Sequence, residues 1–276
     1  TSSSNQDIAL YANARYRIPK KNLEYVAGFR STQNKISGNH FDYRLGIIWS
    51  YSEATVIKAL WGTAYRSANF NESNVDAPPV VIGNNKLAVE VLEGLDLTLN
   101  THGENYIASL NYFWNQTDNE ISVQPGIDNI PTYQNILGKE TSGIEFDFTL
   151  FINKQAKVFI RGSTLFKIKD LQSGRDISDK TIKNNYSLGF SYQINTYLNA
   201  NINMSYTGKW MSAKDYWLTN INLRYQIPFI DNFEIYLLSQ NIFNIKYDYA
   251  QWQDWPIDTI PAEVPNNVTL GFSYSW

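Results

Sequence analysis

The chain contains 276 residues with 23 Lys and Arg, 26 Asp and Glu, 2 His and no Cys, and its formal net charge is -3. Clustered basic residues are missing, which argues against nucleic acid as a partner, because a phosphate-binding surface needs them. The absence of Cys excludes disulfides, zinc–thiolate sites and a thiol nucleophile. No run of about 18 apolar residues occurs, so the sequence predicts no transmembrane helix.

Apolar and polar residues alternate with a period of two along most of the chain, which predicts strands. The predicted strands, about thirteen in number, begin near Asp7, Asn22, Phe41, Ala54, Leu87, Asn105, Ile144, Val158, Tyr186, Leu198, Tyr216, Asn232 and Asn267. Most run to about 10–13 residues, which suits a tilted strand crossing a bilayer better than a soluble strand of about 5–6. The segment near Ala54 alternates poorly, so its facing stays open.

The alternation places the apolar side chains of each predicted strand on one face. In the last segment, Leu270 and Phe272 alternate with Thr269 and Gly271. In a transmembrane barrel the apolar face contacts lipid and the polar face lines an enclosed interior. Aromatic residues near predicted strand ends, such as Trp49, would form the girdle at the membrane interfaces.

Predicted connections alternate between short and long. Short turns are expected at residues 19–21, 51–53, 101–103, 153–155, 195–196 and 228–231. Longer loops are expected at residues 31–39, 66–86, 117–137, 169–181, 210–215 and 244–265. Short turns on one rim and long loops on the other are typical of outer-membrane barrels. The alternative is a soluble β-sandwich, whose strands also alternate.

The sequence therefore predicts an all-β fold, an antiparallel transmembrane β-barrel. Thirteen strands would leave the first and last running the same way, whereas an antiparallel barrel closes with an even number, apart from rare exceptions. An open sheet edge in lipid leaves unpaired backbone groups at several kcal/mol each. We therefore expect further strands upstream of the first residue, rather than a miscount.

Several stretches, in order, carry a family resemblance. They are residues 61–72 (WGTAYRSANFNE), Lys86-Leu87 with residues 93–95 (EGL), residues 112–121 (YFWNQTDNEI), residues 143–146 (GIEF), residues 239–247 (SQNIFNIKY) and the aromatic terminus Trp276. Together they resemble the C-terminal half of the barrel of TonB-dependent outer-membrane receptors. The resemblance implies a barrel of twenty-two strands with an N-terminal plug inside it. Residues 1–276 would then form a single domain holding the last thirteen strands, without the plug and the first strands.

The resemblance also implies a function. It predicts a bacterial outer-membrane receptor for the energy-coupled uptake of a large, scarce ligand, most often a ferric siderophore, with cobalamin, other metal chelates and glycans open. The implied partners are outer-membrane lipid, the iron chelate and an inner-membrane energy-coupling complex that acts through the plug. The alternative from another class is a complete smaller barrel that acts as a passive pore or adhesin. A soluble β-rich binding module is a third reading.

Aromatic residues of the predicted extracellular loops are the candidate ligand contacts. Trp252, Trp255, Tyr247 and Tyr249 share the last long loop, where they would stack on an aromatic siderophore or a sugar ring. Interfacial anchoring or loop packing is the alternative. Trp210 is a further candidate, for which anchoring is favoured over ligand contact.

His40 lies at a predicted outer strand end, where it would touch the ligand or remain a surface residue. Neither His40 nor His102 has the companions that a metal site needs, and no Ser–His pair suggests hydrolysis. We expect no enzyme activity, no cofactor and no metal. By the resemblance, Arg66 and Glu72 match a family motif in which they are architectural.

Six arginines fall on the polar face of the predicted strands. They are Arg15, Arg17, Arg30, Arg44, Arg161 and Arg224. They would either guide an anionic iron chelate or pair with carboxylates of the wall or with a plug, and Glu24, Asp96, Glu145 and Asp147 of the wall are available. Pairing is the preferred interpretation.

Overall fold

The computed structural model describes residues 7–34, 38–250, 259–262 and 265–275. Its main feature is an antiparallel sheet of thirteen strands, and the predicted all-β fold is confirmed. These strands are β1 (Asp7–Ile18), β2 (Leu23–Asn34), β3 (Gly38–Ser50), β4 (Thr55–Arg66), β7 (Glu90–His102), β8 (Tyr106–Asp118), β11 (Lys139–Phe151), β12 (Ala156–Asp170), β13 (Asn184–Gln193), β14 (Leu198–Thr207), β15 (Tyr216–Gln226), β16 (Phe233–Gln240) and β19 (Asn267–Tyr274). Each begins within five residues of its predicted start, and the largest offset separates Ile144 from the observed Lys139 of β11.

The sheet order follows the chain order from β1 to β19 when the short strands are left out. Strands that follow one another pair, as expected of an up-and-down meander with hairpin turns. Within the described residues β1 and β19 are the two edges of the sheet and do not pair with each other. No helix among the described residues is long and apolar enough to cross a membrane.

The shorter elements lie in the connections. They are the helix α1 (Phe70–Asn74), the strands β5 (Asp76–Ala77), β6 (Val81–Ile82), β9 (Glu120–Pro125), β10 (Pro131–Ile136), β17 (Asp248–Ala250) and β18 (Thr259–Pro261), and the 3-10 turns η1 (Pro19–Lys21), η2 (Ile127–Asn129) and η3 (Ser178–Lys180). Short turns occur where they were predicted, for example at η1 between β1 and β2.

The predicted loop at residues 31–39 is wrong in its length. Strand β2 continues to Asn34 and β3 begins at Gly38, and these two residues lie opposite each other in the register. Residues 35–37 lie outside the described residues. The segment is polar, but the ladder hydrogen bonds are made by backbone groups, so side-chain polarity alone does not end a strand.

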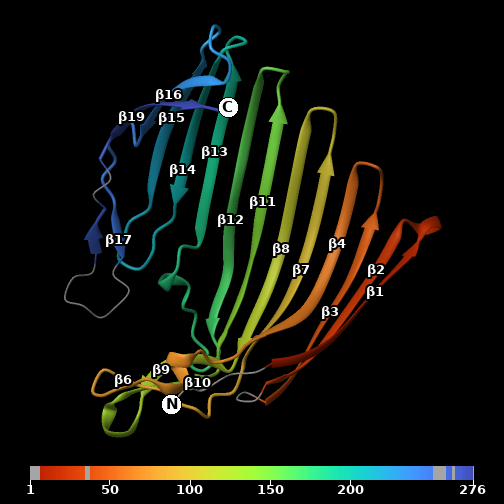
Figure 1. The fold of residues 1–276 in the computed structure, drawn as a ribbon, viewed down its shortest axis with the longest axis vertical. Coiled ribbons are helices and arrows are strands. Elements are labelled where there is room, and N and C mark those ends of the chain that lie inside the picture. The colour runs from red at the N-terminus through yellow and green to blue at the C-terminus, as the bar shows by residue number, and fades with distance from the viewer. Residues whose placement is uncertain (1–6, 35–37, 251–258, 263–264, 276) are drawn as a thin grey trace. The chain divides into compact units, whose positions relative to one another are not determined.

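The chain divides into two compact units. Unit 1 consists of residues 1–99, 112–142 and 167–176, and unit 2 consists of residues 100–111, 143–166 and 177–276. In unit 1 the strands β1 to β4 are antiparallel neighbours (Figure 1). The register between β3 and β4 settles which way the poorly alternating segment faces. Lys58 lies opposite Ile48 and Leu60 opposite Gly46. Because Ile48 in turn lies opposite Glu24 of the polar face, Lys58 and Leu60 stand on the polar face as well.

Alternation along β1 and β2 gives unit 1 one apolar and one polar face. Ile8 and Leu10 of β1 are 66% and 79% exposed on the apolar face. On the polar face, Arg17 lies opposite Glu24. Side chains as apolar as Leu10 are seldom left uncovered on this scale in a soluble domain, so this face is one that a nonpolar medium or partner covers.

Unit 2 repeats the alternation with different polar residues. Strands β12 to β16 and β19 are antiparallel neighbours. The apolar face pairs Leu188 with Met204, while the polar face pairs Ser187 with Ser205 and Asn201 with Asn222. Along β13 and β14 the polar residues of this face are therefore uncharged.

Candidate ligand-binding site

A charged cluster in unit 1 joins the end of β4 to two other elements. The Arg66 guanidinium donates from Nη1 to both carboxylate oxygens of Glu72, each at 2.9 Å, and from Nη2 to Glu90 Oε2 at 2.9 Å. Glu90 Oε2 also accepts from the backbone N–H of Ile121 at 3.1 Å. Glu72 is only 9% exposed. The predicted architectural role of Arg66 and Glu72 is in keeping with this geometry.

Helix α1 begins with a capping box at this cluster. Asn69 Oδ1 accepts from the Glu72 backbone N–H at 2.9 Å, and Glu72 Oε2 accepts from the Asn69 N–H at 2.7 Å. This reciprocal arrangement satisfies two backbone donors at a helix start. Arg66 therefore fixes a helix whose own cap already uses the same carboxylate.

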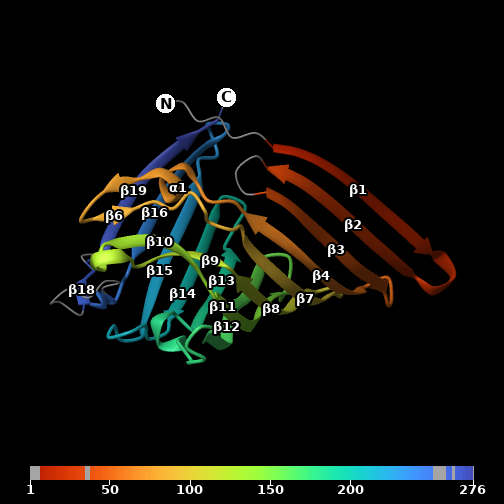
Figure 2. The same ribbon diagram turned by 90° about the horizontal axis from the view of Figure 1, so that it is seen from below.

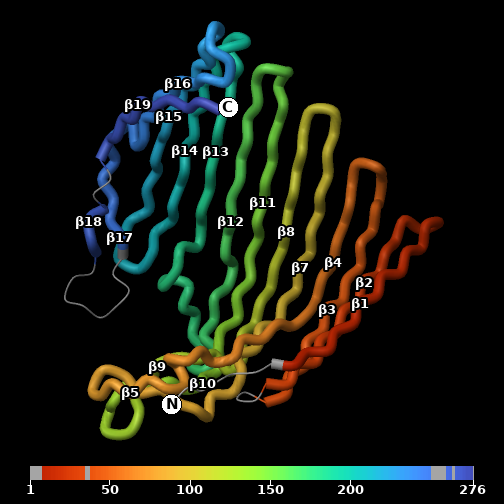
Figure 3. Tube along the Cα trace, viewed as in Figure 1, coloured from red at the N-terminus to blue at the C-terminus, as the bar shows by residue number. Residues whose placement is uncertain are grey.

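The connections after β4 and β8 form a second sheet, which the sequence analysis read as loops. Its order is β5-β6-β10-β9, and β6 runs parallel to β10 with Thr132 opposite Ile82. Figure 3 traces the chain from β4 through β5 and β6 to β7, and from β8 through β9 and β10 to β11. Because β6 and β10 are parallel, the tips of the β5–β6 and β9–β10 hairpins lie side by side (Figure 2).

Two asparagines tie these connections together. Asn135 donates from Nδ2 to the carbonyls of Ala88 and Asn119 at 3.1 and 2.8 Å, and its Oδ1 accepts from the Ala88 N–H at 2.7 Å. Asn84 donates from Nδ2 to the carbonyl of Tyr133 at 3.1 Å. These side chain–backbone hydrogen bonds supplement the few backbone hydrogen bonds that such short strands can form with each other.

The aromatic candidates of the last long connection lie in unit 2. The rings of Tyr247 and Tyr216 stack with centroids 4.1 Å apart, and Tyr249 meets Tyr247 edge-on at 5.7 Å. Burial raises the pKa of Tyr247 to about 12, and its hydrogen bond with Tyr249 acts in the same direction. The sequence did not indicate Tyr216, because it stands at the start of a strand far upstream.

Hydrogen bonds of the buried Asn241 hold the segment that leads to this aromatic cluster. Asn241 is 1% exposed, donates from Nδ2 to the Ile245 carbonyl and accepts at Oδ1 from the Ile245 N–H, both at 2.9 Å. Asn241 and Asn244 both adopt positive φ, which Asn tolerates better than most residues. The Ala262 N–H donates to the Tyr247 carbonyl at 2.9 Å and closes the base of the β17–β18 hairpin.

A hollow of about 800 Å³ adjoins the cluster. It is lined by residues 244–248, 261, 262 and 265, and its character is more apolar than polar. Cavities of roughly 300–1,000 Å³ hold small molecules, so the size suits a bulky ligand. Trp252 and Trp255, predicted for the same site, lie outside the described residues.

Two other predicted contacts are held by hydrogen bonds. The Trp210 indole donates from Nε1 to the Lys180 carbonyl at 2.8 Å, which ties its loop to η3. His40 Nε2 lies 3.1 Å from Asp42 Oδ1, and its ring packs against Tyr65 with centroids 4.2 Å apart. The structure places His40 in unit 1 and the tyrosine cluster in unit 2.

Most of the predicted arginines of the polar face have partners. Arg15 and Arg17 share Glu24 at 2.9 and 3.3 Å, Arg161 pairs with Asp147 at 2.8 Å, and Arg224 pairs with Glu234 at 3.6 Å. Arg30 donates to Thr32 Oγ1 at 3.1 Å. Arg44 has no ion-pair partner in the described part of the chain. The preference for pairing is therefore right for four arginines, although Glu234 was not among the expected carboxylates.

No group of three or more His, Asp or Glu side chains among the described residues is arranged to hold a metal ion.

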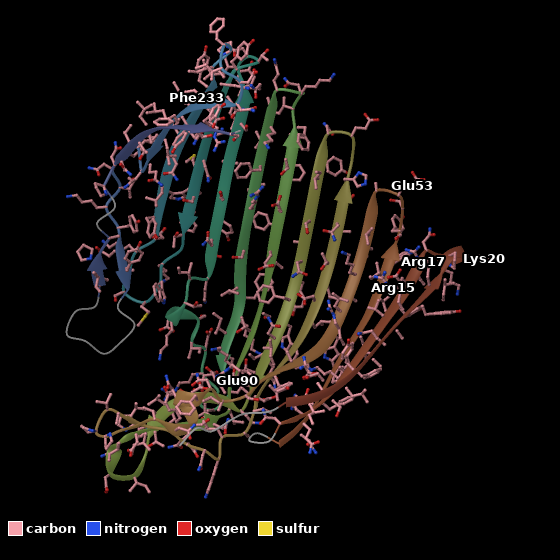
Figure 4. All side chains as sticks on the ribbon, viewed as in Figure 1. Arg15, Arg17, Lys20, Glu53, Glu90 and Phe233 are labelled. Atoms are coloured by element: carbon pink, nitrogen blue, oxygen red, sulfur yellow. The ribbon has the colours of Figure 1, made fainter. Side chains whose placement is uncertain are left out.

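Figure 4 shows where the charged residues of unit 1 lie along its strands: Arg15, Arg17, Lys20 and Glu53 gather at the short-turn end, and Glu90 lies at the opposite end. Charged residues of unit 1 thus occur at both ends of its strands.

Comparison with known proteins decides the family. The model of the family described as TonB dependent receptor-like, beta-barrel matches residues 1–245. The chain belongs to the TonB-dependent receptor family. No protein of curated function matches it by sequence.

Several solved structures share the fold of this TonB-dependent receptor chain. A ferric enterobactin receptor of Pseudomonas aeruginosa is 18% identical, with a TM-score of 0.78 over 98% of this chain and 44% of its own. A mutant of that receptor in complex with enterobactin is 17% identical, with a TM-score of 0.80 over 97% of this chain and 44% of its own. The FrpB iron transporter of Neisseria meningitidis is 17% identical, with a TM-score of 0.75 over 98% and 45%.

The chain thus spans less than half the length of the receptors it resembles. The family and these neighbours are receptors and transporters of the bacterial outer membrane. The predicted recognition is therefore confirmed, and the thirteen-stranded sheet matches part of a TonB-dependent receptor barrel.

Proposed function

We propose that this chain is the C-terminal part of the barrel of an outer-membrane receptor that takes up a ferric siderophore by energy-coupled transport. The observation that supports this best is the likeness of its fold to ferric enterobactin receptors over 97–98% of the chain. The specific siderophore is a property of the extracellular connections, which vary within a shared barrel.

In this proposal Tyr247 and Tyr249 contact the ligand. Tyr247 lines a hollow of about 800 Å³, Tyr249 meets the Tyr247 ring edge-on, and Tyr216 stacks on Tyr247. Aromatic rings give large contact area and stack on flat, aromatic ligands. Trp252 and Trp255 of the same connection remain predicted contacts. Trp210 and His40 remain weaker candidates, since hydrogen bonds hold both side chains.

The two faces of the strands take different environments in this proposal. The apolar face contacts outer-membrane lipid, and the polar face lines the interior, as alternation along tilted strands requires. Energy reaches the receptor from an inner-membrane complex through a plug domain, a partner that the family resemblance implies. The plug and the inner-membrane complex are implied by the family resemblance, and no contact of the described residues identifies them.

The proposal is tested by uptake of radiolabelled iron into cells whose own receptor gene is deleted and which carry the protein from its complete gene. The variant Tyr247→Ala is compared with Tyr51→Ala, which removes an exposed tyrosine from a short turn. We expect Tyr247→Ala to weaken the apparent affinity for the ferric siderophore about tenfold, since stacking on one ring is worth about 1–1.5 kcal/mol. Tyr51→Ala should match the wild type.

Three results would count against siderophore uptake. One is iron uptake that does not depend on the receptor gene. Another is an equal effect of Tyr247→Ala and Tyr51→Ala, which would contradict the part of the proposal that places Tyr247 in the siderophore site. The third is entry of small solutes that persists when the inner membrane is de-energised, which would favour the passive pore.

A further inference from the structure

Three aromatic side chains form a row across β13, β14 and β15, which are neighbours in the sheet of unit 2 (Figure 1). The rings of Tyr186 and Tyr206 stack with centroids 5.8 Å apart, and the Trp217 ring lies 5.0 Å from Tyr206. Tyr186 stands two residues before Leu188, so it belongs to the apolar face. Tyr206 lies opposite both Tyr186 and Trp217 in the register, so the whole row belongs to this face. Aromatic side chains with a polar edge collect where lipid tails meet the headgroups, so the row marks the headgroup level.

The hydroxyl groups of the two tyrosines bond to residues that line a hollow beyond this row. Tyr186 donates its hydroxyl to Asn184 Oδ1 at 3.0 Å, and Tyr206 donates its hydroxyl to Asp215 Oδ2 at 3.2 Å. Asn184, Tyr206 and Asp215 all line this hollow, whose volume is about 400 Å³. The hollow therefore adjoins the apolar face, next to the aromatic row.

Neither a plug nor additional strands would cover this place. The hollow adjoins the apolar face, whereas a plug occupies the interior that the polar face lines in the proposed function. The edges of the sheet, where further strands would pair, are β1 and β19 and not β13, β14 or β15. Lipid is therefore the neighbour that this hollow meets.

The connection before β13 and the connection after β14 build the hollow together. Met211 donates its backbone N–H to the Asp179 carbonyl at 2.8 Å, and Gly208 donates its own to the Asn184 carbonyl at 2.8 Å. Ser178 and Gly208, which also line the hollow, are buried. Backbone hydrogen bonds thus hold the two walls in one arrangement.

Charges of both signs line the hollow without pairing. Lys183 and Lys209 supply two cations, and Asp179 and Asp215 supply two carboxylates. Within the part of the chain that the structure describes, none of these four side chains takes part in an ion pair. The hollow therefore offers a cationic and an anionic group of contacts to one ligand.

A ligand with a single sign of charge would satisfy only half of these groups. A phosphate suits the lysines, which are common phosphate donors, but the carboxylates repel it. A primary ammonium donates up to three hydrogen bonds and suits the carboxylates. A quaternary ammonium has no hydrogen to donate and is recognised by aromatic faces instead. The lining therefore fits a zwitterion that joins a phosphate to a primary amine.

We propose that this hollow binds the phosphoethanolamine headgroup of a membrane lipid. Lys183 and Lys209 hold the phosphate. Asp179 and Asp215 hold the ammonium group, and the acyl chains run along the apolar face over the aromatic row. Charged pockets at membrane surfaces select lipids by their headgroups in this way.

The volume of the hollow falls within the usual range of roughly 300–1,000 Å³ for small-molecule sites. The site shares no lining residue with the hollow beside Tyr247. It rests on the membrane orientation of the proposed function and not on the identity of the transported ligand.

The test uses the protein expressed from its complete gene in detergent micelles, with short-chain phosphatidylethanolamine as the probe. Native mass spectrometry counts the bound lipid during titration, and phosphatidylglycerol and phosphatidylcholine with the same chains are titrated in parallel. The variants are Lys209→Gln, Lys183→Gln, Asp179→Asn and Lys214→Gln. Lys214→Gln is the matched control, since it removes the same charge from the same connection as Lys209 but does not line the hollow. All variants are first compared for the heat-modifiable gel mobility of a folded barrel.

We expect one saturable site that binds phosphatidylethanolamine about tenfold more tightly than either other lipid. Lys209→Gln should weaken this binding about tenfold, the loss of one charged hydrogen bond, and Lys214→Gln should change it less than about twofold. Asp179→Asn should also weaken it about tenfold but should not weaken binding of phosphatidylglycerol, which has no ammonium group. Should Lys209→Gln fail to fold, Lys183→Gln on the other connection carries the same comparison.

Equal affinity for the three lipids, or equal effects of Lys209→Gln and Lys214→Gln, would overturn the proposal in favour of nonspecific lipid contact. Saturation by free O-phosphoethanolamine with the same affinity would overturn it in favour of a soluble ligand. Iron uptake is measured separately in cells. Selective lipid binding without iron uptake would contradict only siderophore transport, and iron uptake without selective lipid binding would contradict only this site.

Discussion

The polar faces of the two units differ in how their side chains are satisfied. In unit 1 the face is charged, and the two carboxylate oxygens of Glu24 lie 2.9 and 3.3 Å from the Nε atoms of Arg15 and Arg17. In unit 2 the face is neutral along β13 and β14, and its ion pairs, Arg161–Asp147 and Arg224–Glu234, lie on other strands.

The neutral face of unit 2 is held by hydrogen bonds between short side chains. Ser187 donates to Asn203 Oδ1 at 2.8 Å, and Asn201 donates from Nδ2 to Asn199 Oδ1 at 2.6 Å. The lesson is that period-two alternation decides which face is polar but not the chemistry of that face. Salt screens the ion pairs on the polar face of unit 1, whereas it has little effect on the hydrogen bonds between uncharged side chains on β13 and β14.

The largest expected effect concerns the two faces of β13. Leu188→Arg puts a cation on the apolar face, and should lower the free energy of unfolding from lipid vesicles by about 3 kcal/mol, the usual cost at mid-bilayer. Ser187→Arg, one residue away on the polar face, should cost about 1 kcal/mol, mainly through the lost bond to Asn203. Denaturant titration in vesicles measures both values. Equal costs would contradict the assignment of faces.

The next effect separates the clamp of unit 1 from its surface ion pairs. Arg66→Ala leaves Glu72 and Glu90 without their cation, and because Arg66 is partly exposed we expect a local loss of about 2 kcal/mol. Hydrogen exchange at the Ser73 amide of α1 and at the amide of its C-cap residue Val75 should speed up accordingly.

The control for the clamp is Lys139→Ala, which breaks an exposed pair with Glu120 at 3.2 Å. It should change exchange in α1 by less than about 0.5 kcal/mol. Unchanged exchange in Arg66→Ala would mean that the capping box alone holds the helix.

A smaller effect sharpens the contrast between charged and neutral walls. Glu24→Gln and Ser187→Ala should each cost about 1 kcal/mol at low salt. At about 1 M salt the Debye length falls to about 3 Å, so the cost of Glu24→Gln should shrink while that of Ser187→Ala persists. Exchange of the β1–β2 and β13–β14 amides reports each wall separately. The same salt response in both would erase the distinction.

The smallest effect concerns ionisation in the loop of unit 2. Burial raises the pKa of Tyr247 to about 12 from an ordinary value of 10.0, so the neutral phenol is favoured in the folded cluster. This contribution to stability is complete below pH 10 and is lost as the pH rises toward 12. The difference in tyrosinate absorption between wild type and Tyr247→Phe should therefore appear near pH 12; a component near pH 10 would show that the ring is solvated.

The sequence was sufficient to predict the thirteen strands, their order and most turns. Alternation is a local property, and residues such as Leu188 and Ser187 show it without any tertiary information. The resemblance at residues 61–72 also predicted an architectural role for Arg66 and Glu72, which form an ion pair in the structure. These features depend on short-range pattern and on spacing within one segment.

The parts that sequence did not predict depend on contacts between distant segments. The small sheet rests on strands of two residues, β5 and β6, and on bonds from Asn84 and Asn135, which sequence reading treats as turn residues. The facing of β4 required the β3–β4 register, because the alternation near Ala54 is poor. Tyr216 joined the candidate site only through stacking.

The most direct test of the account is single-cysteine spin labelling along β13, which is simplified by the absence of Cys from these 276 residues. Labels at Tyr186, Leu188 and Phe190 should collide with lipid-soluble oxygen, and labels at Ser187 and Ser191 should not, so that accessibility alternates at every residue. Oxygen accessibility without alternation, or access of a water-soluble relaxant to the Leu188 position, would contradict a lipid-facing apolar side.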